Sequence, residues 1–149
     1  MEGGDRGGNG ARTAATQFAA EHDELERLLA EHLDHTIAGD FVDAQDSFAA
    51  FALRLRAHLA GEEAELFPRL AAHPSPRWPL RVYAAEHERL RLLLDRHAAR
   101  LARVAAQPAA EPRSRRRQSL ALLDALHSLR HVLEHHQQRE ALALFREVT

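Results

Sequence analysis

Four amphipathic stretches separated by short breaks predict an all-α fold for this chain, an antiparallel up-down-up-down four-helix bundle. Apolar residues recur along each stretch at the 3.6-residue spacing of a helix. Glycine or proline stands in every break between the stretches. The two halves of the chain also repeat each other's pattern, so that each half supplies one pair of helices.

The first predicted helix runs from Thr13 to Ala38, after a glycine-rich segment. Residues 1–11 carry too little apolar surface to fold, so we expect a disordered lead-in to a bundle over residues 12–149. Gly39 suits the end of this helix, and Asp40 suits the cap of the next one. The inward stripe of the first helix is Phe18, His22, Leu25, Leu29 and Leu33.

Three further helices follow. The second runs from Phe41 to Ala72 and ends where residues 73–76 (HPSP) interrupt the pattern. The third has Pro79 in its first turn and ends at residues 108–112. The fourth runs from Arg113 to Val148. The inward positions are Leu80, Tyr83, His87, Leu90, Leu94 and Leu101 in the third helix, and Leu122, Leu126, Leu129, Leu133, His136, Glu140 and Leu144 in the fourth.

Length and composition fit one ordinary globular domain. The chain has 149 residues, of which 45% are hydrophobic and 28% charged, with a formal net charge of −2. This balance gives no electrostatic reason to expect nucleic acid or an anionic membrane as a partner. No apolar run is long enough to span a membrane or resembles a secretory signal, so we expect a cytoplasmic location. All 20 basic residues are arginine, which indicates a GC-rich bacterial genome.

The absence of cysteine narrows the chemistry further. With no cysteine in the sequence, disulfides, thiolate-zinc sites, iron–sulfur clusters and thiol catalysis are excluded together. Any chemistry must therefore use histidine, carboxylates and the single tyrosine.

Two His-x-x-x-Glu motifs, His58/Glu62 and His136/Glu140, lie in the apolar stripes of the second and fourth helices. On a helix, residues four apart share one face, so an imidazole and a carboxylate can converge on one metal ion. An unpaired glutamate would be costly to bury at such a position, and something must compensate it. The motifs align without a gap: Phe48, Phe51, Leu55, His58, Glu62, Leu66 and Phe67 match Leu126, Leu129, Leu133, His136, Glu140, Leu144 and Phe145.

A second repeat supplies two more histidines. Residues 19–22 (AAEH) recur as residues 84–87, so that His22 and His87 occupy matching inward positions. Both lie near the starts of their helices, whereas the His-x-x-x-Glu motifs lie near the ends of theirs. In antiparallel order, four imidazoles and two carboxylates would then meet at one level of the core. We interpret this constellation as a metal site.

The order of these six residues resembles the hemerythrin-like (HHE cation-binding) domains over residues 13–147. The resemblance implies a four-helix bundle that holds two non-haem irons, with glutamates bridging the metals and histidines as terminal ligands. It is closest to the four-His, two-Glu variant of iron-centre repair proteins and of the iron-sensing domain of a ubiquitin ligase subunit. The implied ligands are His22, His58, Glu62, His87, His136 and Glu140.

Oxygen-carrying hemerythrins differ from this chain at two positions. They have a second histidine four residues after the one on the third helix, where this chain has Arg91, and an aspartate five residues after the histidine on the fourth. These departures argue against a dedicated oxygen carrier.

Two classes of function remain open. Imidazole and carboxylate ligands without sulfur suit iron, manganese or zinc, and the resemblance selects iron. We expect a protein that binds or senses oxygen, nitric oxide or iron at a di-iron centre, as a monomer or weak homodimer. The alternative is a di-iron oxidoreductase acting on peroxide or nitric oxide, or an iron donor in iron-centre repair.

Four further positions near the ligands have two interpretations each. Tyr83 stands where the first half has Phe18, so its hydroxyl either bonds to a ligand carboxylate or an oxygen species at the metals, or is part of ordinary packing. His131 and His135 either support or replace a ligand, or lie on an exposed helix face, which we favour. Gly61 provides either room near the metals or close helix packing.

Other polar residues are expected on the surface. The glutamates beside ligand positions would orient imidazoles only if they pointed inward, and residues one apart point about 100° away, so we favour solvated positions for them. Four histidines fall off the ligand stripe. The glutamates in question are Glu21, Glu63 and Glu86, and the histidines are His32, His35, His97 and His127.

Overall fold

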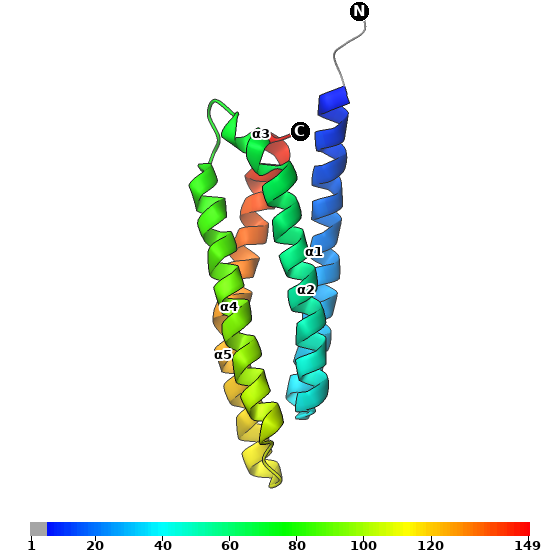
Figure 1. The fold of residues 1–149 in the computed structure, drawn as a ribbon, viewed down its shortest axis with the longest axis vertical. Coiled ribbons are helices and arrows are strands. Elements are labelled where there is room, and N and C mark those ends of the chain that lie inside the picture. Colours follow the sequence, from blue (N-terminus) through cyan, green and yellow to red (C-terminus); the bar gives the residue numbers. More distant parts are fainter. Residues whose placement is uncertain (1–5) are drawn as a thin grey trace, which may run out of the picture.

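The computed structural model describes residues 6–149, which form helices joined by short connections, with no strand among them. Four long helices form the predicted antiparallel bundle, so the predicted fold class is confirmed (Figure 1). Short helical segments follow α2 and α5. The elements are α1 (Arg6–Ala38), α2 (Phe41–Glu65), α3 (Phe67–Ala71), α4 (Leu80–Ala106), α5 (Pro112–Arg139), the π-helix η1 (Glu140–Leu144) and α6 (Phe145–Glu147).

The four long helices pack around one core. Helix α1 packs against α2 and α5, and α4 packs against the same two helices, so α1 and α4 lie diagonally opposite. The segment α3 and the C-terminus share one end of the bundle (Figure 1). The α1–α2 and α4–α5 pairs each form one helical hairpin, as the repeated halves of the sequence predict.

The turn between α1 and α2 has the expected glycine. Gly39 has a φ of 75°, a conformation that residues with a Cβ rarely adopt. Its N–H donates to the Thr36 carbonyl, and the Asp40 N–H donates to the His35 carbonyl, which is the Schellman pattern of a helix end. Asp40 is the N-cap of α2, although its side chain makes no capping hydrogen bond.

Three predicted helix boundaries differ from the structure. Helix α1 begins at Arg6 rather than Thr13, so it includes residues 6–11 of the predicted lead-in, while residues 1–5 lie outside the described residues. Extending an existing helix adds one hydrogen bond for each residue fixed, and this can offset the cost of glycine. The second predicted helix is broken at Leu66, because Pro68 lacks an N–H and its ring would clash with the preceding turn.

The fourth predicted helix widens into a π-helix at Glu140 before it ends. The two breaks occupy matching places in the repeat, since each follows or includes the glutamate of a His-x-x-x-Glu motif. The first has Pro68 as its cause, and the second has no proline.

Two apolar clusters make up the core, and they lie on opposite sides of the predicted ligand layer. In α4, for example, Tyr83 belongs to one cluster, Leu90 to the other, and His87 lies between them. The long core comprises Leu25, Phe41, Ala44, Phe48, Phe51, Leu55, Leu59, Leu90, Leu93, Leu94, Leu101, Leu122, Leu126, Leu129 and Leu133. The end core comprises Ala14, Phe18, Leu66, Phe67, Leu70, Tyr83, Leu144 and Val148.

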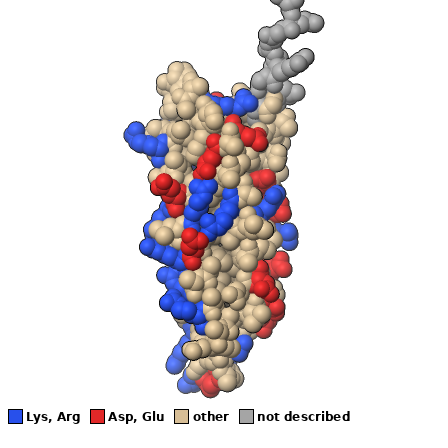
Figure 2. Space-filling view, in the orientation of Figure 1, with Lys and Arg blue, Asp and Glu red and all other residues tan. Residues whose placement is uncertain are grey.

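Charge is distributed unevenly over the surface. Arginines gather along the left edge of the face in Figure 2, and acidic side chains along its lower right edge. The sequences of the helices agree, because α1 and α2 contain more acidic than basic residues and α4 and α5 the reverse. Within residues 6–149, no helix has both the length and the apolar character needed to cross a bilayer.

Candidate metal centre

All six residues that the sequence predicts as ligands come together in the layer between the two cores. They form two groups, in each of which one potential ligand atom per residue lies within 4.8 Å of the others. The layer is level because the His-x-x-x-Glu motifs lie late in α2 and at the α5–η1 junction, while the single histidines lie earlier in α1 and α4. The groups are His22, His58 and Glu140, and Glu62, His87 and His136.

The two glutamates occupy the middle of the layer, with imidazoles on either side. Glu140 Oε1 lies 3.4 Å from His22 Nε2 and 2.9 Å from His136 Nε2. Glu62 Oε1 lies 3.1 Å from His58 Nε2 and 3.8 Å from His136 Nε2. Each carboxylate therefore faces imidazoles from both hairpins, the arrangement required of a group that bridges two metal ions.

The imidazoles are paired by hairpin. The rings of His22 and His58 lie 5.1 Å apart between centroids, and those of His87 and His136 lie 4.8 Å apart. One pair comes from α1 and α2, and the other from α4 and α5. Each pair can serve one metal ion, with the carboxylates between them.

The inward polar atoms of this layer have no protein partner. Glu62 and Glu140 are fully buried. Among the described residues, neither their oxygens nor the Nε2 atoms of the imidazoles have a hydrogen-bond partner; the histidines concerned are His22, His58, His87 and His136. Burying two carboxylates without compensation costs several kcal/mol, and bound cations would remove that cost. The donor set, nitrogen and oxygen without sulfur, fits iron.

The protonation states also favour metal binding. Burial would raise the pKa of Glu62, but the adjacent His136 and His58 imidazoles outweigh it and lower this pKa to about 2. Burial, followed by the neighbouring imidazoles, lowers the pKa of His22 and of His87 to about 4. At neutral pH Glu62 is thus ionised and His22 and His87 are neutral, the forms that bind metals. Burial would lower the pKa of His58 and of His136, but the carboxylates that face them outweigh it and raise both pKa values.

Three further glutamates hold the outer nitrogens of the imidazoles, and the prediction that they are solvated surface residues is wrong. Glu21 Oε2 lies 2.6 Å from His58 Nδ1, Glu63 Oε1 lies 2.8 Å from His87 Nδ1, and Glu86 Oε1 lies 3.3 Å from His136 Nδ1. Because an ionised carboxylate only accepts hydrogen bonds, each Nδ1 donates and each Nε2 presents its lone pair to the layer.

The sequence contained the information needed to place these glutamates. Each directly follows or precedes a ligand position, so its side chain points about 100° away from that ligand. In a bundle that direction leads to the neighbouring helix, where the glutamate meets another helix's histidine. For a helix considered alone, the same direction leads to solvent, which is why the prediction failed.

Arginines fix these glutamates in turn. Arg91 donates two hydrogen bonds to Glu63, at 2.6 and 3.0 Å. Arg139 Nε donates to Glu86 at 3.2 Å, and its guanidinium lies over the Trp78 ring at 4.6 Å. Arg91 therefore fixes the carboxylate that supports His87.

An aromatic wall closes the end-core side of the layer. Phe18 lies 5.7 Å from the His58 ring, Phe67 lies 4.9 Å from the His87 ring, and Phe145 lies 5.5 Å from the His22 ring, between centroids. This wall excludes bulk water from the inward nitrogens.

Tyr83 stands in the same wall. It is fully buried, and its hydroxyl has no hydrogen-bond partner among the described residues. Burial, followed by the charge of Glu147, raises its pKa to about 12. The ring of Tyr83 lies 6.5 Å from that of His136, so Tyr83 packs in the core as one of its two interpretations predicts. Its hydroxyl has no partner among the described residues.

Gly61 allows close packing. A Cβ at this position would lie 2.9 Å from Cε1 and 3.2 Å from Cζ of Phe18, closer than side chains tolerate. Of its two sequence interpretations, the structure therefore supports close helix packing.

Two of the histidines predicted on the surface are buried. His32 and His97 are at most 1% exposed, and their rings lie 5.5 Å apart in the long core beside Phe48. The prediction was wrong because the inward stripe was drawn too narrowly. His32 follows Leu25 by seven residues, and His97 follows Leu90 by the same interval, so both belong to the core-facing repeat.

The remaining histidine predictions match the structure. His127 is exposed and His35 is partly exposed. His131 and His135 are also exposed and line an outer groove of about 360 Å³ over α4 and α5. Neither belongs to the groups of potential metal ligands in the described residues.

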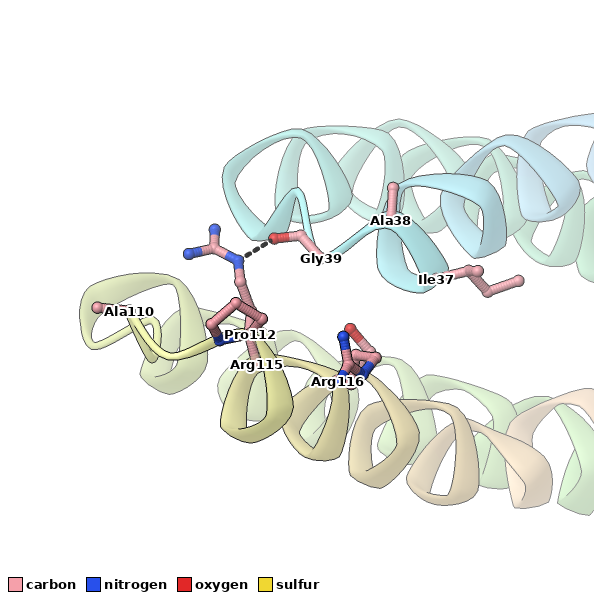
Figure 3. Close-up of a pocket in the computed structure, with 8 residues that line it drawn as sticks. Ile37, Ala38, Gly39, Ala110, Pro112, Arg115 and Arg116 are labelled. Atoms are coloured by element: carbon pink, nitrogen blue, oxygen red, sulfur yellow. Dashed lines mark hydrogen bonds between the residues drawn. The ribbon is translucent and has the colours of Figure 1, made fainter.

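A separate hollow of about 240 Å³ lies between the end of α1 and the start of α5 (Figure 3). Arg115 crosses its edge and donates a hydrogen bond to the Gly39 carbonyl. No residue of the ligand layer lines this hollow, which therefore plays no part in the candidate centre.

Comparison with known proteins gives one match. The family model described as the hemerythrin HHE cation-binding domain matches residues 13–148. No match was found among curated proteins or among solved structures.

Proposed function

We propose, on the premise that this chain belongs to the hemerythrin HHE cation-binding domain family, that it binds two non-haem irons and takes up a small ligand there. The proposed ligands of the irons are the two groups of the layer, with Glu62 and Glu140 as bridges. The ligand taken up is oxygen, nitric oxide or iron itself, and the protein binds or senses it.

One observation carries this proposal. Within the part of the chain that the structure describes, the inward nitrogens and oxygens of six buried or nearly buried residues have no hydrogen-bond partner. A layer of this kind inside an apolar core is costly unless cations occupy it. The two carboxylates would partly neutralise two divalent ions, the imidazoles would coordinate them without adding charge, and bound iron would offer its remaining positions to a small ligand.

The surroundings of the layer favour small uncharged ligands. The end core covers the layer with phenylalanine and leucine side chains, which offer no countercharge to an anionic substrate. Diatomic molecules need neither a wide channel nor charged recognition groups. The chain's own contribution is to hold three of the four ligand imidazoles, those of His58, His87 and His136, in one tautomer through outer glutamates, and to keep water out.

Arg91 argues against the role of a dedicated oxygen carrier. Its guanidinium is engaged with both oxygens of Glu63. An arginine remains protonated at physiological pH and does not coordinate metals, so no fifth imidazole is available at this position.

The alternative, an oxidoreductase that acts on peroxide or nitric oxide, is supported by Tyr83. The Tyr83 ring lies 6.5 Å from the His136 ring, and its buried hydroxyl, which has no partner among the described residues, is a candidate hydrogen-bond donor to a bound ligand. A side chain that only completed the packing would not need a hydroxyl group.

Optical spectroscopy of the iron-loaded protein separates the two functions. Metal-free protein is loaded anaerobically with ferrous iron and exposed separately to oxygen, nitric oxide and hydrogen peroxide. Binding or sensing predicts a spectral change that saturates at one ligand per centre and reverses when the gas is removed. Continuous consumption of peroxide or nitric oxide would instead establish the oxidoreductase. A matched control is the variant His131→Ala/His135→Ala, which leaves the layer intact and should behave as wild type.

A further inference from the structure

We propose that the two halves of the centre hold their metals unequally, and that the metal held by His22 and His58 is the weaker and exchangeable one. The inference rests on the proposed di-metal function and names which half admits and releases metal. It follows from a difference between the two halves of the repeat.

Among the described residues, His22 lacks the outer carboxylate that the other three imidazoles of the layer have. The Nδ1 atoms of His58, His87 and His136 each face a glutamate at 2.6 to 3.3 Å. The sequence repeat matches His22 with His87, and it matches Glu63, the partner of His87, with Ala141. An alanine cannot accept a hydrogen bond through its side chain, so His22 lacks the support that its counterpart has.

The matching histidines His22 and His87 also differ in their exposure to solvent. The side chain of His22 is 15% exposed, whereas that of His87 is 1% exposed. The group containing Glu62, His87 and His136 is buried throughout. Water and metal ions can therefore reach the α1–α2 half more readily than the α4–α5 half.

The two glutamates of the layer differ in the backbone conformation around them. Glu62 lies within regular α2, whereas Glu140 and Ala141 lie in the π-helix η1. Single-turn π segments are frequent at functional sites. The half that contains His22 thus differs from the other in its outer hydrogen bond, its exposure and the backbone of its carboxylate.

The magnitude follows from the role of such outer carboxylates. Removing the hydrogen-bonded partner of a metal-binding histidine lowers metal affinity by about 10- to 100-fold. We therefore expect two successive metal dissociation constants that differ by about this factor, with the α4–α5 half filling first and emptying last.

Titration of the metal-free protein with Co²⁺, followed by visible absorption and by competition with a chelator, tests the inference. Cobalt(II) reports each half without the oxidation that ferrous iron undergoes. The wild-type protein should bind two ions in separable steps, and His22→Ala should remove the weaker step while the tighter one remains.

Two substitutions outside the ligand set should change the separation in a defined direction. Glu63→Ala removes the support of His87 and should bring the two steps together by weakening the tighter one. Ala141→Glu places a carboxylate at the matching exposed position and should bring them together by tightening the weaker one. Glu65→Ala, at an exposed position of the same helix as Glu63, is the control and should leave both steps unchanged.

The possible failures are distinguishable. Two equal steps in the wild type, loss of the tighter step in His22→Ala, or an unchanged separation in Glu63→Ala would each overturn the inference while leaving the di-metal centre in place. If neither half bound Co²⁺, the proposed function itself would be overturned.

Discussion

Replacing Gly61 with alanine tests how closely α1 and α2 pack beside the ligand layer. The added Cβ would lie 2.9 Å from Cε1 of Phe18, and the Phe18 ring is only 4% exposed and lies beside His58. Overpacking of this kind costs about 1–3 kcal/mol. Alanine is favoured over glycine within a helix by about 1 kcal/mol. We therefore expect Gly61→Ala to lower the free energy of unfolding by roughly 1 kcal/mol.

A double-mutant cycle identifies the cause. In a Phe18→Leu background the clash is relieved, so Gly61→Ala should be neutral or should stabilise by up to about 1 kcal/mol. Urea unfolding of the metal-free wild type, both single variants and the double variant gives these differences directly. Iron content of the loaded proteins should remain unchanged in the double variant.

Two results would refute this reasoning. If Gly61→Ala stabilises the protein in the presence of Phe18, the close approach is not a constraint. If iron content falls in Gly61→Ala and stays low in the double variant, the glycine provides room for the metals and not for the ring.

Three further outcomes are expected. Tyr83→Phe should keep the fold and iron occupancy but change the rate at which oxygen or peroxide oxidises the reduced centre, and superimposable stopped-flow traces would leave Tyr83 as ordinary core. Burial, followed by the charges of His32 and Arg100, lowers the pKa of His97 from 6.5 to about 4. The contribution of neutral His97 to the free energy of unfolding is therefore fully present above pH 6.5 and falls by roughly 3 kcal/mol toward pH 4. His97→Leu should flatten that slope in metal-free urea unfolding, and an unchanged slope would exclude His97 as its source. Removing metal should lower the melting temperature by about 10–20 °C if each ion is present at about 100 times its dissociation constant, and equal melting temperatures would show that the layer does not bind metal.

The level of the ligand layer could be predicted from the sequence because it depends on two robust features. Helical periodicity places His58 and Glu62 on one face, and antiparallel order brings the late part of one helix beside the early part of the next. The repeat then supplied the same geometry twice. These features do not depend on the details of neighbouring side chains.

The surroundings of the layer could not be predicted in the same way, because they depend on contacts between helices. To predict the role of Glu63, one must know that its neighbour is α4. To predict the break at Leu66, one must weigh Pro68 against an apolar pattern that continues past it. The burial of His32 and His97 is a different failure. Their spacing was present in the sequence, but the inward stripe was drawn too narrowly to include them.

Metal analysis of the purified protein tests the central claim most directly. Protein expressed in iron-replete cells should contain close to two irons per chain. His58→Ala and His136→Ala should each lower that content, and His131→Ala, an exposed histidine outside the layer, should not. A single zinc per chain, or no bound metal, would contradict the account.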